Sequence, residues 1–167
     1  MKDSSTAPTG AKTPEAPPTD RPSHRPLHLH GRFVLVVAAG GILGASSRYG
    51  FGMALPAPDA WPLPTLLINL TGALALGWLL EELARSGPDA GLRRVARLGI
   101  GSGFLGAYTT YSTLALDSVH LFGAGRGMGA VWYLAASLFG GAAATTLGIW
   151  LGALRHKSAE KKRNSPP

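Results

Sequence analysis

The chain has 167 residues, enough for one ordinary domain, and 46% of them are hydrophobic. Lys and Arg number 16 against nine Asp and Glu, which gives a formal net charge of +7. This charge would suggest nucleic acid in a soluble protein, but the basic residues here lie outside long uncharged blocks, and we expect no nucleic-acid partner. The absence of cysteine excludes a disulfide framework and a thiolate metal site.

Both ends of the chain are polar, and the centre is strongly apolar. Residues 1–31 are rich in proline, Ser, Thr and basic residues, and we predict a disordered tail there. Residues 155–167 form a second basic tail. The region between them, residues 32–154, is predicted to be a single transmembrane domain.

Uncharged blocks within this domain are long enough to cross a bilayer, which takes about 20 apolar residues in a helix. The first block runs past Arg48, and a secretory signal peptide is its rival interpretation because basic residues precede it. We favour a membrane span because the apolar region continues too far and no convincing cleavage site follows. The blocks predict four transmembrane helices, at about 32–54, 61–83, 95–121 and 128–154.

Basic residues set the predicted orientation. With four spans, both tails and the loop between the second and third spans share one side of the membrane. That loop holds Arg85, Arg93 and Arg94, whereas the opposite side has Arg126 and at most Arg48. The positive-inside rule therefore predicts a multi-pass protein of the cell membrane with both termini in the cytoplasm.

The stretch GFLGAYTTYSTLALD, residues 103–117, is unusual for a membrane span because glycines and hydroxyl side chains fill its middle. Non-helical backbone at membrane depth is tolerated only inside protein or around a cavity. We therefore predict that this third helix is broken. A broken helix bares carbonyl groups that can hold a cation, and the N-terminus of its second half can face an anion.

Polar residues elsewhere at membrane depth are further functional candidates. The amide of Asn69 can donate to an anion or bond a neighbouring helix, and both interpretations stay open. Arg48 either reaches the membrane interface or supplies positive potential to a vestibule. On the last helix Tyr133, Ser137 and Thr145 recur at multiples of four residues, which predicts a stripe of hydroxyl donors interrupted by Gly141.

Three segments together resemble the CrcB or Fluc family of fluoride channels: GGILGASSRY (40–49), PTLLINLTGALALG (64–77) and GFLGAYTTYST (103–113). The resemblance covers all four predicted helices, and only the tails fall outside it. It implies an all-α membrane protein with four helices per subunit, the third broken, which pairs as an antiparallel dimer around two narrow pathways. It also implies passive export of fluoride, which relieves its toxicity, and no enzymatic activity.

Residue roles follow from the same resemblance, position by position. Backbone carbonyls of Gly106 and Thr109 match those that hold a structural Na⁺ at the dimer centre, an ion that is not transported. Arg48 matches the arginine that closes the first-helix signature, at a vestibule. The fluoride pathway is expected to comprise Asn69, Tyr111, Ser112, Thr113, Leu114, Tyr133, Ser137 and Thr145.

Two features depart from the family pattern. The family places two phenylalanines on the third helix where this chain has Tyr111 and Leu114, and leucine has no ring edge. The strong charge bias also disfavours insertion of one chain in both orientations. The dimer partner is therefore either the chain itself or a paralogous subunit of opposite orientation, and we favour the heterodimer, in which this subunit alone conducts poorly or not at all.

Competing functions are weaker. A small multidrug exporter also has four short helices, but it needs a carboxylate in its first helix, which is absent here. A non-transporting scaffold does not explain the polar residues at membrane depth. A soluble enzyme is excluded by the four predicted spans.

Overall fold

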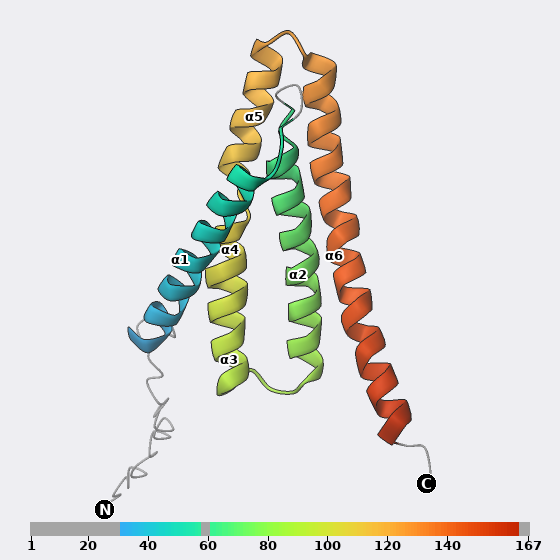
Figure 1. Ribbon diagram of the computed structural model, residues 1–167. Helices are drawn as coiled ribbons and strands as arrows, with labels where there is room; N and C mark the ends of the chain where they lie inside the picture. The colour runs from blue at the N-terminus through green and yellow to red at the C-terminus, as the bar shows by residue number, and fades with distance from the viewer. Residues whose placement is uncertain (1–30, 58–60, 164–167) are drawn as a thin grey trace, which may run out of the picture.

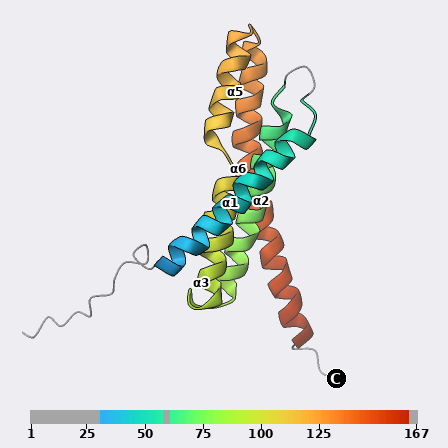
Figure 2. The ribbon, with the colours of Figure 1, turned by 60° about the vertical axis from the view of Figure 1, so that its left-hand side comes forward.

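Long helices dominate the structure, a computed structural model that describes residues 31–57 and 61–163 (Figure 1). Helix α1 lies at an angle across the others, and α2 and α6 run side by side in both views (Figure 2). Short segments follow one another between α2 and α6. The elements are α1 (Gly31–Ala54), α2 (Leu63–Arg85), α3 (Leu92–Ala96), η3 (Arg97–Leu105), α4 (Gly106–Tyr108), α5 (Tyr111–Gly123) and α6 (Gly127–Arg163).

The expected all-α fold is confirmed, because the described residues form helices and no strand. Three helices are long and apolar enough to cross a membrane, in the ranges Gly31–Ala54, Leu63–Arg85 and Gly127–Ser158. The third predicted span, 95–121, falls on the consecutive segments from α3 to α5. The expected N-terminal tail, 1–31, lies outside the described residues except for Gly31, and so does the end of the C-terminal tail.

Helix α6 continues to Arg163, well past the predicted end of the span at residue 154. The basic residues from position 155 onwards end the apolar segment, as the predicted span implies. They do not end the helix, because Arg, Lys, Ala and Glu are all strong helix formers. The first part of the predicted C-terminal tail is therefore helical.

Glycines bring the main helices into backbone contact. A Cβ placed on Gly148 of α6 would lie 2.2 Å from the carbonyl oxygen of Leu74 on α2, and one on Gly77 would lie 2.4 Å from that of Thr145. A Cβ on Gly44 of α1 would lie 2.1 Å from the carbonyl oxygen of Phe104. Close backbone approach of this kind is what packs helices in lipid.

Substitution of Gly148 by Ala should therefore push α2 and α6 apart. We expect a loss of about 1–3 kcal/mol in stability, the usual cost of overpacking, measured as a lower melting temperature in detergent. Gly52→Ala is the matched control, because a Cβ on Gly52 would meet nothing within 4 Å. Equal melting temperatures for the two variants would contradict this packing.

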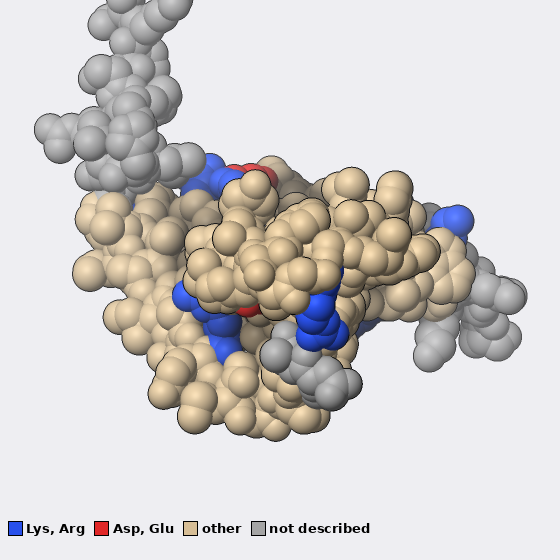
Figure 3. All heavy atoms as spheres, turned by 90° about the horizontal axis from the view of Figure 1, so that it is seen from above, with Lys and Arg blue, Asp and Glu red and all other residues tan. Residues whose placement is uncertain are grey.

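A small core lies where α5 and α6 meet the start of α2. It contains Leu66, Leu121, Ala130 and the fully buried Tyr133, with Trp61 packed edge-on against the tyrosine ring. Most other large apolar side chains are exposed. From the end where α5 joins α6, the surface is mostly uncharged (Figure 3). These exposed apolar faces suit contact with lipid or with another subunit.

Candidate functional site

The helical segments of the expected third span are interrupted at Thr109 and Thr110. Both residues are extended, with φ/ψ of −77°/157° and −148°/123°, between the end of α4 at Tyr108 and the start of α5 at Tyr111. The segment η3, which precedes α4, is π-helical, a geometry that often marks functional sites. Two successive irregularities thus lie in the glycine- and threonine-rich stretch.

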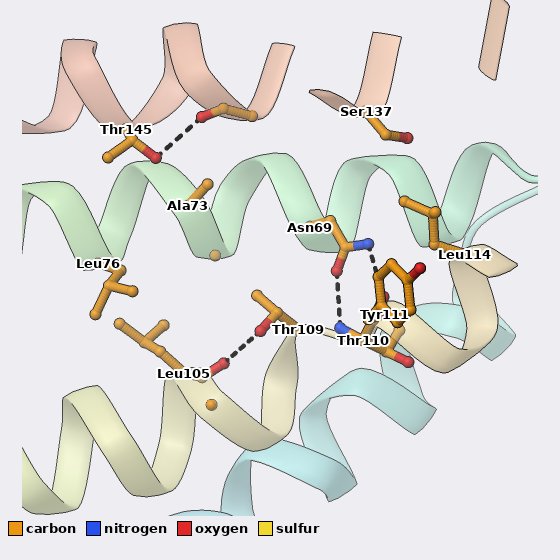
Figure 4. A pocket seen from close by; sticks show the side chains of 13 residues that line it. Asn69, Ala73, Leu76, Leu105, Thr109, Thr110, Tyr111, Leu114, Ser137 and Thr145 are labelled. Atoms are coloured by element: carbon orange, nitrogen blue, oxygen red, sulfur yellow. Dashed lines mark hydrogen bonds between the residues drawn. The ribbon is translucent and has the colours of Figure 1, made fainter. Parts of the chain in front are cut away.

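The amide of Asn69 on α2 holds this interruption in place. Its Nδ2 donates to the Thr110 carbonyl at 3.0 Å, and its Oδ1 accepts from the Thr110 N–H at 2.8 Å (Figure 4). One side chain thereby satisfies both backbone groups of a residue that has left the helix. The structure thus shows the second of the two interpretations left open for Asn69, and its role in the fluoride pathway stays a prediction.

The Thr110 side chain starts the next helix. Its Oγ1 accepts from the backbone N–H of Thr113 at 3.1 Å, as an N-cap does, and donates to the hydroxyl of Thr113 at 3.0 Å. The hydroxyl of Ser112 lies 3.2 Å from the same oxygen. Ser112 and Thr113, both expected in the fluoride pathway, are therefore joined in the hydrogen-bond network of a helix cap.

A cavity of about 390 Å³ lies beside the interruption, between α2, α5 and α6. It collects most of the candidate residues from distant parts of the sequence, and Figure 4 shows them around it. The predicted residues that line it are Asn69, Gly106, Thr109, Tyr111, Leu114, Ser137 and Thr145; the others are Gly72, Ala73, Leu76, Leu105, Thr110 and Gly141.

Helix α6 supplies hydroxyl groups to this cavity. Thr145 donates to the carbonyl oxygen of Gly141 on its own helix at 3.0 Å. The Oγ of Ser137, by contrast, is buried and has no hydrogen-bond partner among the described residues. Buried polar atoms are normally paired, so this unpaired hydroxyl beside the cavity is a candidate donor.

Tyr133, Ser112, Thr113 and Arg48 do not line this cavity. Tyr133 is fully buried, and its hydroxyl donates to Asp117 Oδ2 at 3.3 Å. The four-residue spacing in the sequence predicts that Tyr133 and Ser137 share a helix face, but it does not predict that Asp117 of α5 binds the Tyr133 hydroxyl. Its place in the pathway stays a prediction, as do those of Ser112, Thr113 and Arg48.

Gly72 and Thr110 are site residues that the sequence analysis did not single out. A Cβ on Gly72 would lie 2.3 Å from Cγ2 of Thr109, so this glycine lets the interrupted chain approach α2. It lies one turn after Asn69 on the same helix face. Threonine is a favoured residue directly before the first turn of a helix, and this preference could have identified Thr110 as the N-cap of α5.

The cavity is chemically neutral. Its lining has hydroxyl groups, one amide and apolar side chains, and none of the lining residues is acidic or basic. Neutral donors can replace part of the hydration shell of a small anion without holding it as tightly as a fixed positive charge would. This arrangement suits passage of an anion better than its storage.

Comparison with known proteins identifies the family. Residues 35–149 match the family described as CrcB-like protein, Camphor Resistance (CrcB). The chain is 47% identical to "Fluoride-specific ion channel FluC 2" of Leifsonia xyli subsp. xyli, over 80% of this chain and 92% of that protein. It is 43% identical to "Fluoride-specific ion channel FluC 2" of Geobacillus kaustophilus, over 71% and 88%.

A third relative, "Fluoride-specific ion channel FluC 1" of Cutibacterium acnes, is 44% identical over 68% of this chain and 82% of that protein. The names of these relatives describe ion channels, not enzymes. Together with the long apolar helices, they indicate a multi-pass membrane protein. The resemblance seen in the sequence is confirmed: the chain belongs to the CrcB family.

Proposed function

We propose that the protein is a fluoride-selective ion channel that exports fluoride passively from the cytoplasm and so reduces its toxicity. The observation that carries this proposal is the neutral cavity beside the extended residues Thr109 and Thr110, with the unpaired hydroxyl of Ser137 on its wall. The names of the relatives support the choice of anion. Fluoride is small and strongly hydrated, so a narrow pathway must offer close donors in place of water.

The fluoride pathway runs through this cavity, past Asn69 and Tyr111 and along the hydroxyl groups of α6. Thr109 lies here in extended backbone, which takes its carbonyl out of the helical direction. An unwound carbonyl of this kind is a suitable Na⁺ ligand. Thr109, together with Gly106 at the start of the short helix α4, would therefore hold a structural sodium ion. Such an ion would fix the interruption and would not be transported.

The chain crosses the cell membrane four times, with the segments from α3 to α5 as the third, interrupted span and both termini in the cytoplasm. Arg85 at the end of α2, Arg93 and Arg94 in α3, and the basic residues at the end of α6 support this orientation. Two subunits pair antiparallel. Tyr111 supports the pairing because it lines the cavity and yet is 82% exposed in one subunit, which leaves its ring available for contact with a second subunit.

The partner is a paralogous subunit of opposite orientation. Two observations favour this heterodimer over a homodimer: the charge bias, which fixes one orientation, and Leu114, which lines the cavity where an aromatic ring edge is expected. The partner then has the opposite bias and supplies the intact aromatic pair.

Fluoride efflux from proteoliposomes, with chloride as the control anion, tests both proposals. We expect slow or no efflux from this chain alone and rapid, fluoride-selective efflux when the paralogous subunit is added. Rapid fluoride efflux from the chain alone would support the channel and contradict the need for a heterodimer. No efflux from folded protein in either preparation would contradict the channel itself.

Ser137→Ala should slow fluoride efflux by about tenfold in the conducting preparation. A hydrogen bond from one donor to a charged group contributes about 1.5–3 kcal/mol. If about half of this stabilises the ion at the free-energy barrier to permeation, its loss slows efflux by about tenfold. Stability should change little, because the hydroxyl bonds no other group of the described chain. Thr146→Val is the control, since Thr146 is exposed and bonds the carbonyl of Ala142. Equal rates for both variants would remove Ser137 from the pathway.

A further inference from the structure

A second cavity, of about 310 Å³, lies at the basic end of the molecule, far from the interruption. It lies between the start of α1 and α3, and each of these two helices contributes one arginine to its lining. Figure 1 shows the start of α1 and the short helix α3 together at the end opposite the α5–α6 turn. The lining residues are Arg32, Phe33, Val36, Gly91, Leu92, Arg94 and Val95.

Charge in this cavity is positive and only partly compensated. Arg94 donates through Nε and Nη2 to the backbone carbonyl of Asp89, at 3.1 and 2.6 Å, which holds its guanidinium and leaves other N–H groups available. Asp89 itself is bound by Arg97, with Nη2 to Oδ2 at 2.7 Å. That bond holds the pKa of Asp89 below its usual range. The one nearby carboxylate is thus shared: it bonds Arg97 and lies 3.7 Å from Nε of Arg94, so one negative charge faces three arginines when Arg32 is included.

The second cation is Arg32, which lines the cavity from α1. The Arg32 guanidinium lies 4.6 Å from the centre of the Phe33 ring, a cation–π contact that orients it. Between the arginines the wall is apolar. Leu92 is 86% exposed beside the arginines, so an apolar side chain is available there for contact with lipid.

We propose that this cavity binds the headgroup of an anionic phospholipid. The two arginines bind its phosphate, and its acyl chains lie along the apolar wall that Leu92 and Val95 extend. Arginine suits this role because its planar guanidinium bonds phosphate oxygens in pairs. Basic cavities between helices at the cytoplasmic surface attract anionic headgroups. The assignment to the cytoplasmic leaflet rests on the proposed orientation, but the binding itself does not.

Free phosphate shares the charge of the headgroup but lacks its chains. The combination of two cations with an exposed leucine therefore favours the lipid. The site is also independent of fluoride transport, because it shares no residue with the neutral cavity. If fluoride transport were disproved, the proposal of a lipid site would still stand.

The test measures lipid binding to the full chain in detergent by its melting temperature. Phosphatidylglycerol and phosphatidylcholine with identical acyl chains are titrated separately, and inorganic phosphate is titrated as a third probe. We expect phosphatidylglycerol alone to raise the melting temperature in a saturable way. Arg32→Gln should weaken its apparent affinity about fivefold, the usual effect of one arginine near an anionic headgroup. This variant leaves the contacts of Asp89 in place.

Arg94→Gln should weaken the affinity to a similar degree, although it also frees the α2–α3 loop. Arg155→Gln is the control, because it removes the same charge from α6, outside this cavity. An equal loss with Arg155→Gln would mean diffuse attraction and overturn the site. Equal shifts with the two lipids, or the full shift with inorganic phosphate alone, would overturn the proposal as well.

Discussion

Replacement of Asn69 by Ala is expected to abolish measurable fluoride efflux from the conducting preparation, which contains both subunits, with a loss of at least about 100-fold. Two hydrogen bonds, at 3.0 and 2.8 Å, would disappear together and leave the carbonyl and the N–H of Thr110 unpaired. Each unpaired buried backbone group costs about 1–3 kcal/mol. The extended segment would then shift, and displacement of a pathway by about 1 Å is enough for a loss of this size.

Hydrogen exchange at the interruption separates this positioning role from a general loss of fold. In Asn69→Ala we expect faster exchange of the Thr110 amide, while the amides of α2 and α6 stay protected. Asn69→Asp is the second variant. It keeps an oxygen that can accept the Thr110 N–H, but it loses the donor and adds a negative charge beside the cavity. Normal efflux in either variant, or unchanged exchange at Thr110, would contradict the role of Asn69.

Much of the fold could be predicted because it depends on local composition. The uncharged blocks gave α1, α2 and the apolar part of α6, since apolar length alone determines whether a helix can span a bilayer. The extended residues Thr109 and Thr110 lie within the stretch that glycines and hydroxyl groups mark, and a break in a third membrane span at this place stays a prediction. The π-helical segment η3 was not predicted, because no local residue pattern specifies that geometry.

The site was less predictable, because it depends on which groups meet in space. Asn69 and Thr110 are 41 residues apart, so the sequence could only leave two interpretations of the amide open. Tyr133 shares its periodicity with Ser137, yet its hydroxyl meets Asp117 on another helix, and it is fully buried in the small core. Periodicity gives the face of a helix but not the residues opposite that face.

Leu114→Phe is expected to raise fluoride efflux by about tenfold in preparations of this chain alone. Leu114 lines the cavity directly after the cap residues Ser112 and Thr113, where its side chain offers no polarised group to an anion. The edge of a phenyl ring carries partial positive charge, so it offers an anion a polarised group that leucine lacks. A tenfold rise corresponds to a barrier lower by about 1.4 kcal/mol. The measurement is initial efflux rate at equal protein density.

This gain should come with a loss of stability, because Leu114 also packs against the core that contains Leu121 and Tyr133. Additional atoms in a packed region cost about 1–3 kcal/mol, so the melting temperature should fall. Leu114→Met is the matched control: it keeps about the same apolar volume with a more flexible side chain, and it has no ring edge. A similar rise in efflux with Met would attribute the effect to looser packing. An unchanged rate in folded Leu114→Phe would show that a ring edge at this position does not limit conduction, and the case for a partner subunit would then rest on the charge bias alone.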